Sequence, residues 1–432
     1  MNRQENNEGR APTYRDVLAF APFRRLWLGQ AISQLGDSLY FLVFLFMADR
    51  LGGGDSRLVG LVGIVQTLPF VLLSPFTGVI ADRADRRRIM LFADTMSATG
   101  LGLFAVLLLF QPTPPAWLLL CLAAMLSCVN AFFLPAKSAA LPSLVSGELL
   151  TQANSLSAAT QSVMPLLGVG LSASVLSGLY AATPKIFFVA AVLLNAISFG
   201  LSALFIRALP RLVPDRSARD VSDNGAQGWR DFVDGVRYVR QNTVLTTLLV
   251  CGTLVQFAIG PFMVVYIAAN RQWFGGGFGT LAWFEFAFTA GMVAGSIWVG
   301  RANLRRPGVA FIAGLALVGL CIAGLGLSRT AFGFVLWNVV AGIALPFSQV
   351  PINTYVQATV PSRFLGRVNA ALTAAGMAAQ PLAIGLGGIA VRPLGPGTML
   401  LLMGIGMILT ALGGLCVRDF RRVALPGAKA AD

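Results

Sequence analysis

Long apolar runs recur along the whole chain, and short polar connections separate them. Each run holds roughly 20 residues, the length that a helix needs to cross a hydrocarbon core of about 30 Å. The runs do not alternate apolar and polar residues as the strands of an outer-membrane barrel do. The pattern predicts an all-α, polytopic membrane protein. Its twelve expected transmembrane helices lie at 26–47, 58–80, 89–110, 117–134, 150–179, 185–205, 245–268, 280–299, 309–327, 331–354, 367–391 and 397–417.

The composition excludes several classes of protein. Of the 432 residues, 56% are hydrophobic and only 12% are charged, whereas soluble domains carry about 25% charged residues. The chain has no histidine, and its five cysteines lie inside apolar runs without a CxxC pair, so we expect no metal site. It has no phosphate-binding P-loop, and no polar stretch is long enough to house an enzyme. We therefore expect neither an enzyme nor a bound cofactor.

The Lys and Arg residues divide unequally between the two sides of the predicted membrane. Of the 32, 26 lie in the termini and in the connections that follow even-numbered helices, and six lie in the remaining connections. The positive-inside rule places the basic side in the cytoplasm. We therefore expect a multi-pass protein of a bacterial inner membrane with both termini cytoplasmic. Because topology accounts for the net charge of +14, we expect no nucleic-acid partner.

The longest connection, 206–244, divides the chain into two sets of six helices. The expected parts are a cytoplasmic segment at 1–25, a six-helix bundle at 26–205, the loop at 206–244, a second bundle at 245–417 and a tail at 418–432. The loop ends in WRDFVDGVRYVRQ, where Trp229, Phe232 and Val236 recur at the spacing of an amphipathic surface helix. RADRRR at 83–88 matches RANLRR at 301–306, so the halves repeat in parallel, as in many transporters.

A dense charge cluster, GVIADRADRRR at 78–88, lies between the second and third predicted helices. It resembles the signature of the major facilitator superfamily, in which Gly, three residues, Asp-Arg, one residue and Gly precede basic residues. Asp85 stands where the signature has Gly. The matching residues are Gly78, Asp82, Arg83, Arg86, Arg87 and Arg88, and a degenerate second copy holds Arg301, Arg305 and Arg306. With twelve helices in two halves, the whole chain is similar to this family.

The resemblance implies two pseudo-symmetric six-helix bundles and a cytoplasmic gate. Family members place the Asp of the signature, here Asp82, against the cytoplasmic start of helix 11, here near Ser362–Arg367. Asp82 would then face the positive end of that helix, and the arginines would reach carboxylates or lipid phosphates. Such contacts would hold the bundles together while the cavity faces outward and would break when it opens inward. The alternative is that the four arginines only set the topology.

Charged residues within the predicted helices are few. Asp37 lies about 11 residues into the first helix, roughly 16 Å along it and therefore near the midplane. Gln30, Gln34 and Asp37 share one helical face, because they are four and then three residues apart. A carboxylate at this depth is costly and normally faces a cavity or a partner. We expect Asp37 to bind protons or substrate; the alternative is a structural acid hydrogen-bonded by Gln34 or Ser38. Gln256 falls near the equivalent position of the second half.

Two further acids are candidates. Glu285 is the only acid within the helices predicted for the second half. It either takes part in coupling or substrate binding, or it has a structural role and pairs with a residue such as Arg271. Asp94 lies about one turn into the third helix, and we expect it in the gate network with Arg83 or Lys137; the alternative is a role in transport. We find no Lys or Arg near the middle of a predicted helix.

Three segments resemble one branch of the family: FRRLWLGQAISQLGDSLY at 23–40, FFLPAKSAALPSLV at 132–145 and PSRFLGRVNAAL at 361–372. That branch holds macrolide exporters, the enterobactin exporter and a lysophospholipid flippase. The resemblance implies proton-coupled efflux of an amphipathic or hydrophobic small molecule, drug-like or siderophore-like, by alternating access.

Several alternatives remain open at this point: a lysophospholipid flippase of the same fold, an importer of a sugar or organic anion, and a non-transporting membrane scaffold. For the exporter, the proton gradient is the energy source and no cofactor is needed. The expected partners are the small-molecule substrate and the lipid bilayer, and we expect a monomer.

Overall fold

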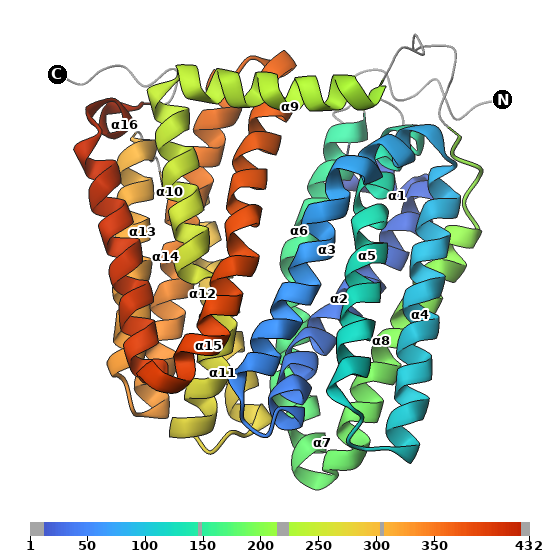
Figure 1. Cartoon of the computed structure of the whole chain (residues 1–432). Coiled ribbons are helices and arrows are strands. Elements are labelled where there is room, and N and C mark those ends of the chain that lie inside the picture. Colours follow the sequence, from blue (N-terminus) through green and yellow to red (C-terminus); the bar gives the residue numbers. More distant parts are fainter. Residues whose placement is uncertain (1–12, 146–148, 214–223, 303–305, 425–432) are drawn as a thin grey trace.

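The computed structural model describes residues 13–145, 149–213, 224–302 and 306–424, and every regular element in these ranges is a helix (Figure 1). The helices pack into two groups that stand side by side, one from each half of the chain (Figure 1). The short helices α1 (Tyr14–Ala19) and α16 (Arg418–Arg422) lie at the same end of the molecule as α9 (Asn224–Gln241). We call this end the α9 face and the opposite end the far face.

The first half supplies six membrane crossings. They are α2 (Ala21–Leu51), α3 (Ser56–Arg83), α4 (Arg86–Phe110), α5 (Ala116–Ala140), α6 (Leu150–Leu171) continued by α7 (Ser177–Ala182), and α8 (Pro184–Arg207). A 3-10 turn, Leu141–Ser143, follows α5, and a π-helical turn, Ser172–Leu176, joins α6 to α7. A π turn inserts an extra residue without ending the helix, so α6 and α7 form one crossing.

The second half begins after α9. Its helices are α10 (Thr243–Ile259) continued by α11 (Phe262–Trp273), α12 (Phe278–Arg301), α13 (Pro307–Leu327), α14 (Ala331–Thr359) and α15 (Ser362–Cys416). Eleven helical segments of the described chain are long and apolar enough to cross a membrane.

The last of these segments accounts for the twelfth crossing. It runs over Phe364–Cys416, 53 residues, which at 1.5 Å per residue would be about 80 Å long if straight. A hydrocarbon core is only about 30 Å thick. Gly395 interrupts the segment with φ 75°, a backbone conformation that glycine adopts without steric cost. The chain therefore turns back at Gly395, and the prediction of twelve transmembrane helices in two bundles is confirmed.

Glycines with positive φ form two other far-face turns. Gly53 and Gly54 lie between α2 and α3, and Gly275 and Gly276 lie between α11 and α12. Asp55 ends the first of these turns, and its side chain accepts a hydrogen bond from the Arg57 backbone at 3.0 Å. This contact satisfies one of the free N–H groups at the start of α3.

Small residues set the distances between neighbouring helices. A Cβ atom added at Gly291 of α12 would lie 2.4 Å from the Val339 carbonyl of α14, and one added at Gly342 would lie 2.1 Å from the Phe288 carbonyl. These helices therefore approach closely only because glycine stands at both positions. Such small-residue contacts are the usual means of packing helices in lipid, where no hydrophobic force draws them together.

The loop helix α9 is attached to the second half. Tyr238 stacks on Phe364 of α15 with ring centroids 4.9 Å apart. Asp234 pairs with Arg367 of α15 at 3.6 Å, and Gly235 lies against the Arg367 backbone. The side chains of Trp229 and Phe232, named in the amphipathic pattern, lie outside the described residues. The described part of α9 thus covers the start of α15.

Candidate functional site

A polar cavity of about 590 Å³ lies within the first half. Helices α2, α3, α4, α5, α6 and α8 all contribute to its wall. Its polar lining residues are Gln30, Ser33, Gln34, Asp37, Gln66, Asp94, Ser97, Ser127, Asn130, Lys137 and Gln161. So many polar side chains facing one space in a membrane helix bundle indicate a binding site or an ion path.

Asp37 lies halfway along α2 and reaches the cavity together with Gln30 and Gln34. Its side chain is exposed to this space. The amide of Asn195 on α8 donates a hydrogen bond to Asp37 Oδ1 at 3.3 Å. Ser38, considered above as a partner, donates instead to the Gln34 carbonyl at 2.7 Å. The hydrogen bond therefore comes from α8, and the rest of the carboxylate faces the cavity.

A buried polar seam joins α2 to α8 beside Asp37. Asn195, Ser198 and Ser202 lie on one face of α8 with exposed fractions of 1%, 6% and 0%. The Ser198 hydroxyl donates to Asn195 Oδ1 at 3.0 Å or to the Asn195 carbonyl at 2.8 Å. Gly29 and Gly36 of α2 face this seam, and a Cβ at Gly36 would lie only 2.1 Å from Ser198 Oγ. The two glycines therefore let the polar face of α8 reach α2.

Asp94 lies at the end of the seam that is nearer the α9 face. It is 2% exposed, lines the same cavity as Asp37 and lies beside Ser202. Asp94 Oδ2 and Ser202 Oγ are both buried, and the two side chains face each other. We expected Asp94 in the gate network with Arg83 or Lys137. The structure places it in the cavity wall, and the described residues show no ion pair between Asp94 and Lys137.

Lys137 is a charged residue that the sequence analysis misplaced. We assigned it to the connection after 134, but α5 continues to Ala140 although Pro135 lies within it. Lys137 therefore lies on a transmembrane helix and lines the cavity. It also borders a smaller space of about 150 Å³ with Gln30, Gln34 and Gln161. A cation therefore faces the cavity from the last turn of a transmembrane helix, where the sequence analysis expected a connection.

The second-half candidates lie elsewhere. Neither Glu285 nor Gln256 lines the cavity that contains Asp37. Glu285 is half-buried on α12, and its neighbour Phe286 faces Gly170 of α6 in the other half. Gln256 on α10 faces Gly376 of α15. The structure therefore does not bring Glu285 or Gln256 together with Asp37.

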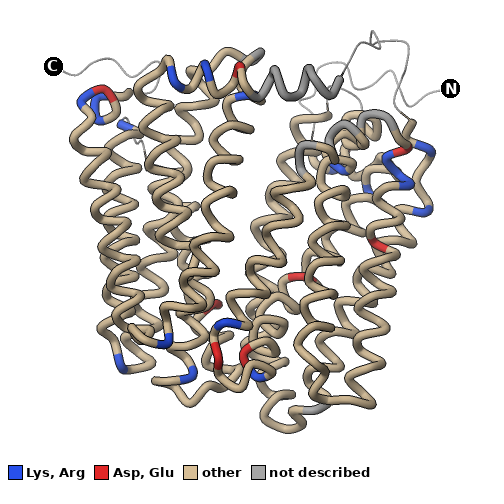
Figure 2. Tube along the Cα trace, in the orientation of Figure 1, with Lys and Arg blue, Asp and Glu red and all other residues tan. Residues whose placement is uncertain are grey.

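The two halves are tied together at the far face, where charged residues of both signs meet (Figure 2). Arg271 of α11 forms an ion pair with Asp49 of α2, so its partner is not Glu285. Arg50 of α2 donates to the Gly276 carbonyl at 3.2 Å and to the Tyr180 hydroxyl at 2.7 Å. The contacts of Arg271 with Asp49 and of Arg50 with Gly276 join residues 222 and 226 positions apart, in opposite halves of the chain. Sequence reasoning missed Asp49 and Arg50 because it ended the first helix at 47.

Apolar contacts reinforce this closure. The Phe278 ring of α12 lies 5.5 Å from the Phe46 ring and 4.7 Å from the Phe187 ring, both in the first half. Gly60 of α3 meets Gly388 of α15 so closely that a Cβ at Gly60 would lie 3.1 Å from the Gly388 Cα. The far face is therefore sealed by packed rings and by touching helix backbones as well as by charge.

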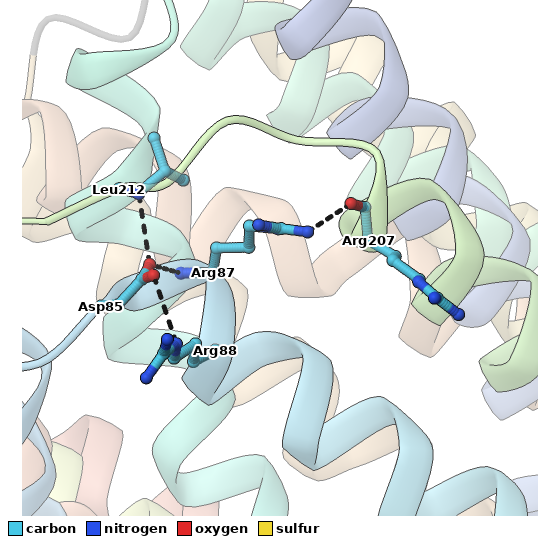
Figure 3. Close-up of polar contacts among 5 residues, drawn as sticks. All are labelled: Asp85, Arg87, Arg88, Arg207 and Leu212. Carbon is cyan, nitrogen blue, oxygen red and sulfur yellow. Dashed lines mark hydrogen bonds and ion pairs between the residues drawn. The ribbon is translucent and has the colours of Figure 1, made fainter.

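The signature cluster contacts its own half of the molecule (Figure 3). Asp85 caps α4, accepting from the Arg87 backbone at 3.1 Å and from the Leu212 backbone at 3.2 Å. Arg88 pairs with Asp85 at 3.8 Å. Arg87 donates to the Arg207 carbonyl at the end of α8 at 2.5 Å. An arginine there meets the negative end of the helix dipole.

The remaining arginine of this run binds the neighbouring helix end. Arg86 donates to the Ala139 carbonyl of α5 at 2.9 Å and to Ser143 Oγ at 3.3 Å. Asp85, which replaces the Gly of the signature, thus has a capping role. The side chains of Asp82 and Arg83, the placement around Gly78 and the whole of Arg305 lie outside the described residues. Arg301 and Arg306 are exposed at the α9 face, and the gate stays a prediction.

Comparison with known proteins gives consistent matches along the chain. The profile of the Major Facilitator Superfamily matches residues 26–384. Macrolide efflux protein A of Streptococcus pyogenes is 26% identical over 406 residues, covering 93% of this chain and 97% of that protein. Macrolide efflux protein A of Enterococcus faecalis is 28% identical over 316 residues, covering 72% of this chain and 94% of that protein.

Solved structures show the same fold. A bacterial homologue of the iron transporter ferroportin in an inward-facing state superposes with a TM-score of 0.70 at 14% identity, covering 93% of this chain and 98% of that one. A proton-dependent oligopeptide transporter superposes with a TM-score of 0.68 at 14% identity, covering 93% and 99%. At this identity the likeness concerns the fold alone.

Proposed function

Because this chain belongs to the Major Facilitator Superfamily, whose members are transporters and not enzymes, we propose that it exports an amphipathic or hydrophobic small molecule in exchange for protons. The proposal takes efflux from the two macrolide efflux relatives at 26% and 28% identity. Proton coupling is inferred from the carboxylates that line the cavity. The energy source is the proton gradient, and no cofactor takes part.

The orientation of the protein in the membrane is inferred from the charge on the two faces. Lys and Arg gather at the α9 face, around α9, α16 and the start of α4 (Figure 2). The positive-inside rule makes this face cytoplasmic. The protein then lies in the inner membrane of a bacterium with both termini in the cytoplasm. In this orientation the far face, closed by the Asp49–Arg271 pair, is the outer side.

The observation that carries the proposal is the placement of Asp37. Its carboxylate faces a polar cavity from the middle of a membrane helix, with one hydrogen bond from Asn195 at 3.3 Å. A charged carboxylate at the bilayer centre costs several kcal/mol, so proton uptake changes its free energy substantially. Asp37 can therefore couple the conformation of the protein to the proton gradient. Gln30 and Gln34, on the same face, supply neutral hydrogen-bonding groups for substrate.

Alternating access requires the outer contacts to break while the inner ones form. In this conformation the outer side is closed by the Asp49–Arg271 pair and by the aromatic rings around Phe278. Rocking of one half against the other would separate these contacts and bring Asp37 into contact with the outer solution. A proton would be taken up there as substrate leaves to the outside, and it would be released to the cytoplasm in the present state, where the next substrate molecule binds.

A lysophospholipid flippase is the second candidate, and Lys137 favours it. A phosphate headgroup needs a cation, and Lys137 supplies one on the cavity wall. The same cavity holds two carboxylates, Asp37 and Asp94, which would repel a phosphate. The exporter of a neutral or cationic amphiphile is therefore the better match to the charges present.

Uptake into inside-out vesicles tests the function. We would add a fluorescent macrolide, a lipophilic cation, a siderophore or a labelled lysophospholipid to the medium outside the vesicles, with and without a protonophore. We expect one of the first three to accumulate only while the proton gradient is intact. Lysophospholipid movement that is indifferent to the protonophore would instead support the flippase. The matched control is Asp55→Asn, which keeps a capping side chain on the far face.

A further inference from the structure

Asp94 is a buried carboxylate. It is not part of the family signature, and the coupling role proposed for Asp37 does not involve it. It is 2% exposed, and its Oδ2 has no hydrogen-bond partner. The buried hydroxyl of Ser202 lies beside it and is one donor that faces this carboxyl group. An ionised carboxylate is not stable in such a place without a cation or several donors. Among the described residues, no Lys or Arg forms an ion pair with Asp94. This indicates that the Asp94 carboxyl group exchanges a proton.

Asp94 and Asp37 are connected by the polar seam of α8. Asn195 touches Asp37, Ser198 touches Asn195, and Ser202 lies beside Asp94. From Asn195 to Ser202 is seven residues, or roughly 10 Å along the helix. Asp94 is the acid nearer the α9 face, because its helix starts there at Arg86. Both carboxylates also line the same cavity.

We propose that Asp94 is a second proton site, which receives the proton from Asp37 and releases it toward the α9 face. The step is a proton transfer without change of oxidation state: the Asp37 carboxylic acid becomes a carboxylate as the Asp94 carboxylate becomes an acid. The Asp94 proton then passes to water at the inner end of the cavity. This inference rests on the proposed function, because it divides the coupling role of Asp37 between two residues.

The other titratable groups that face Asp94 limit the alternatives. Tyr40 on α2 and Lys137 on α5 share the cavity with it. The described linings from α3, α6 and α8 are Gln66, Gln161 and Phe199, which do not titrate. Lys137 carries positive charge at the inner end of the cavity. A positive charge in the same cavity lowers the free energy of the Asp94 carboxylate and so favours release of its proton.

Infrared difference spectroscopy on the purified protein in lipid nanodiscs tests the proton site without any substrate. Spectra at successive pH values report the C=O band of each protonated carboxyl group. We expect Asp94→Asn to remove one band component, and Asp37→Asn to remove another while moving the titration midpoint of the Asp94 component. Asp94→Glu should restore a carboxyl band. Ser202→Ala, which keeps the carboxylate and removes the facing hydroxyl, should shift the Asp94 band.

Two results would overturn the proposal. One is an Asp94→Asn spectrum that superimposes on the native spectrum across the pH range, since Asp94 would then exchange no proton. The other is an Asp94 component that titrates identically with and without Asp37, since the two sites would then be independent. Neither spectroscopic measurement depends on transport. Failure of the exporter hypothesis is detected separately, as an absence of gradient-dependent uptake into vesicles that contain the native protein.

A flux measurement separates a proton site from a structural role. In proteoliposomes we expect Asp94→Asn to lower substrate-driven proton flux by about tenfold or more relative to the exchange of labelled macrolide measured in the same vesicles. Asp94→Glu should recover part of the flux. Loss of exchange and proton flux together in a folded Asp94→Asn protein would make Asp94 a substrate or packing residue and contradict the proposal.

Discussion

The guanidinium of Arg271 on α11 pairs with the carboxylate of Asp49 on α2, and this pair joins the two halves of the chain at the far face. Asp49 is 8% exposed at its side chain and Arg271 is 29% exposed. The pair is therefore largely shielded from water and salt. Because alternating access must separate these residues, the pair favours the conformation in which the far face is closed.

Removal of this pair should shift the conformational equilibrium. Asp49→Ala or Arg271→Ala loses a charge-assisted contact worth about 1.5 to 3 kcal/mol, roughly tenfold or more in the population ratio. Spin labels at Thr183 and Phe332, exposed at the far face in opposite halves, should report longer distances in either variant. The double variant Asp49→Arg with Arg271→Asp should restore the native distances. Unchanged distances in the single variants would show that the rings and glycines alone hold the closure.

The seam between α2 and α8 should not tolerate a methyl group. A Cβ at Gly36 would lie 2.1 Å from Ser198 Oγ and 2.6 Å from Asn195 Oδ1. Overpacking of this kind costs about 1–3 kcal/mol, so Gly36→Ala should lower the thermal unfolding temperature. Gly200→Ala is the matched control on α8, since a Cβ at Gly200 meets nothing within 4 Å. Equal unfolding temperatures for the two variants would contradict the close packing described.

Asp85 should contribute to stability as a helix cap. Its side chain accepts from the backbones of Arg87 and Leu212, so Asp85→Ala should destabilise the protein by about 0.5–2 kcal/mol in unfolding by denaturant. Asp85→Asn keeps an accepting oxygen and should lose less. Arg88→Ala should change little, because the Arg88 side chain is 76% exposed. A larger loss from Arg88→Ala than from Asp85→Ala would mean that the ion pair, rather than the cap, matters.

Glu285 separates the two coupling candidates. It is half-buried on α12 and does not line the cavity of Asp37. We therefore expect Glu285→Gln to retain substrate-driven proton flux in proteoliposomes. Abolished flux in a Glu285→Gln protein that is folded and binds substrate would move the coupling site to the second half.

The fold was largely predictable, because apolar runs of membrane-spanning length are a strong signal. The twelve crossings follow from them, and the turn at Gly395 falls in the glycine- and proline-rich connection between the last two predicted spans. The ends of helices were less predictable, since polar residues also occur in helices near the membrane surface. Lys137 and Asp49 were placed in connections for this reason, although α5 and α2 continue past them.

The site was predictable only in part. The spacing of Gln30, Gln34 and Asp37 placed them on one face, and all three line the cavity. Asn195 as the partner of Asp37 could not be inferred, because helical spacing gives no information about which helix lies opposite. Asp94 shows the same limit: its depth in α4 suggested the gate, while the direction of its side chain places it with Asp37.

The most direct test of the central claim is substrate-driven proton flux in proteoliposomes that contain the native protein or Asp37→Asn. A pH-sensitive dye inside the vesicles records proton movement when an exported macrolide or lipophilic cation is added. The account predicts flux with the native protein and with Asp55→Asn, and none with Asp37→Asn. Substrate movement without proton flux, unchanged in Asp37→Asn, would contradict proton-coupled export and favour a flippase or facilitator.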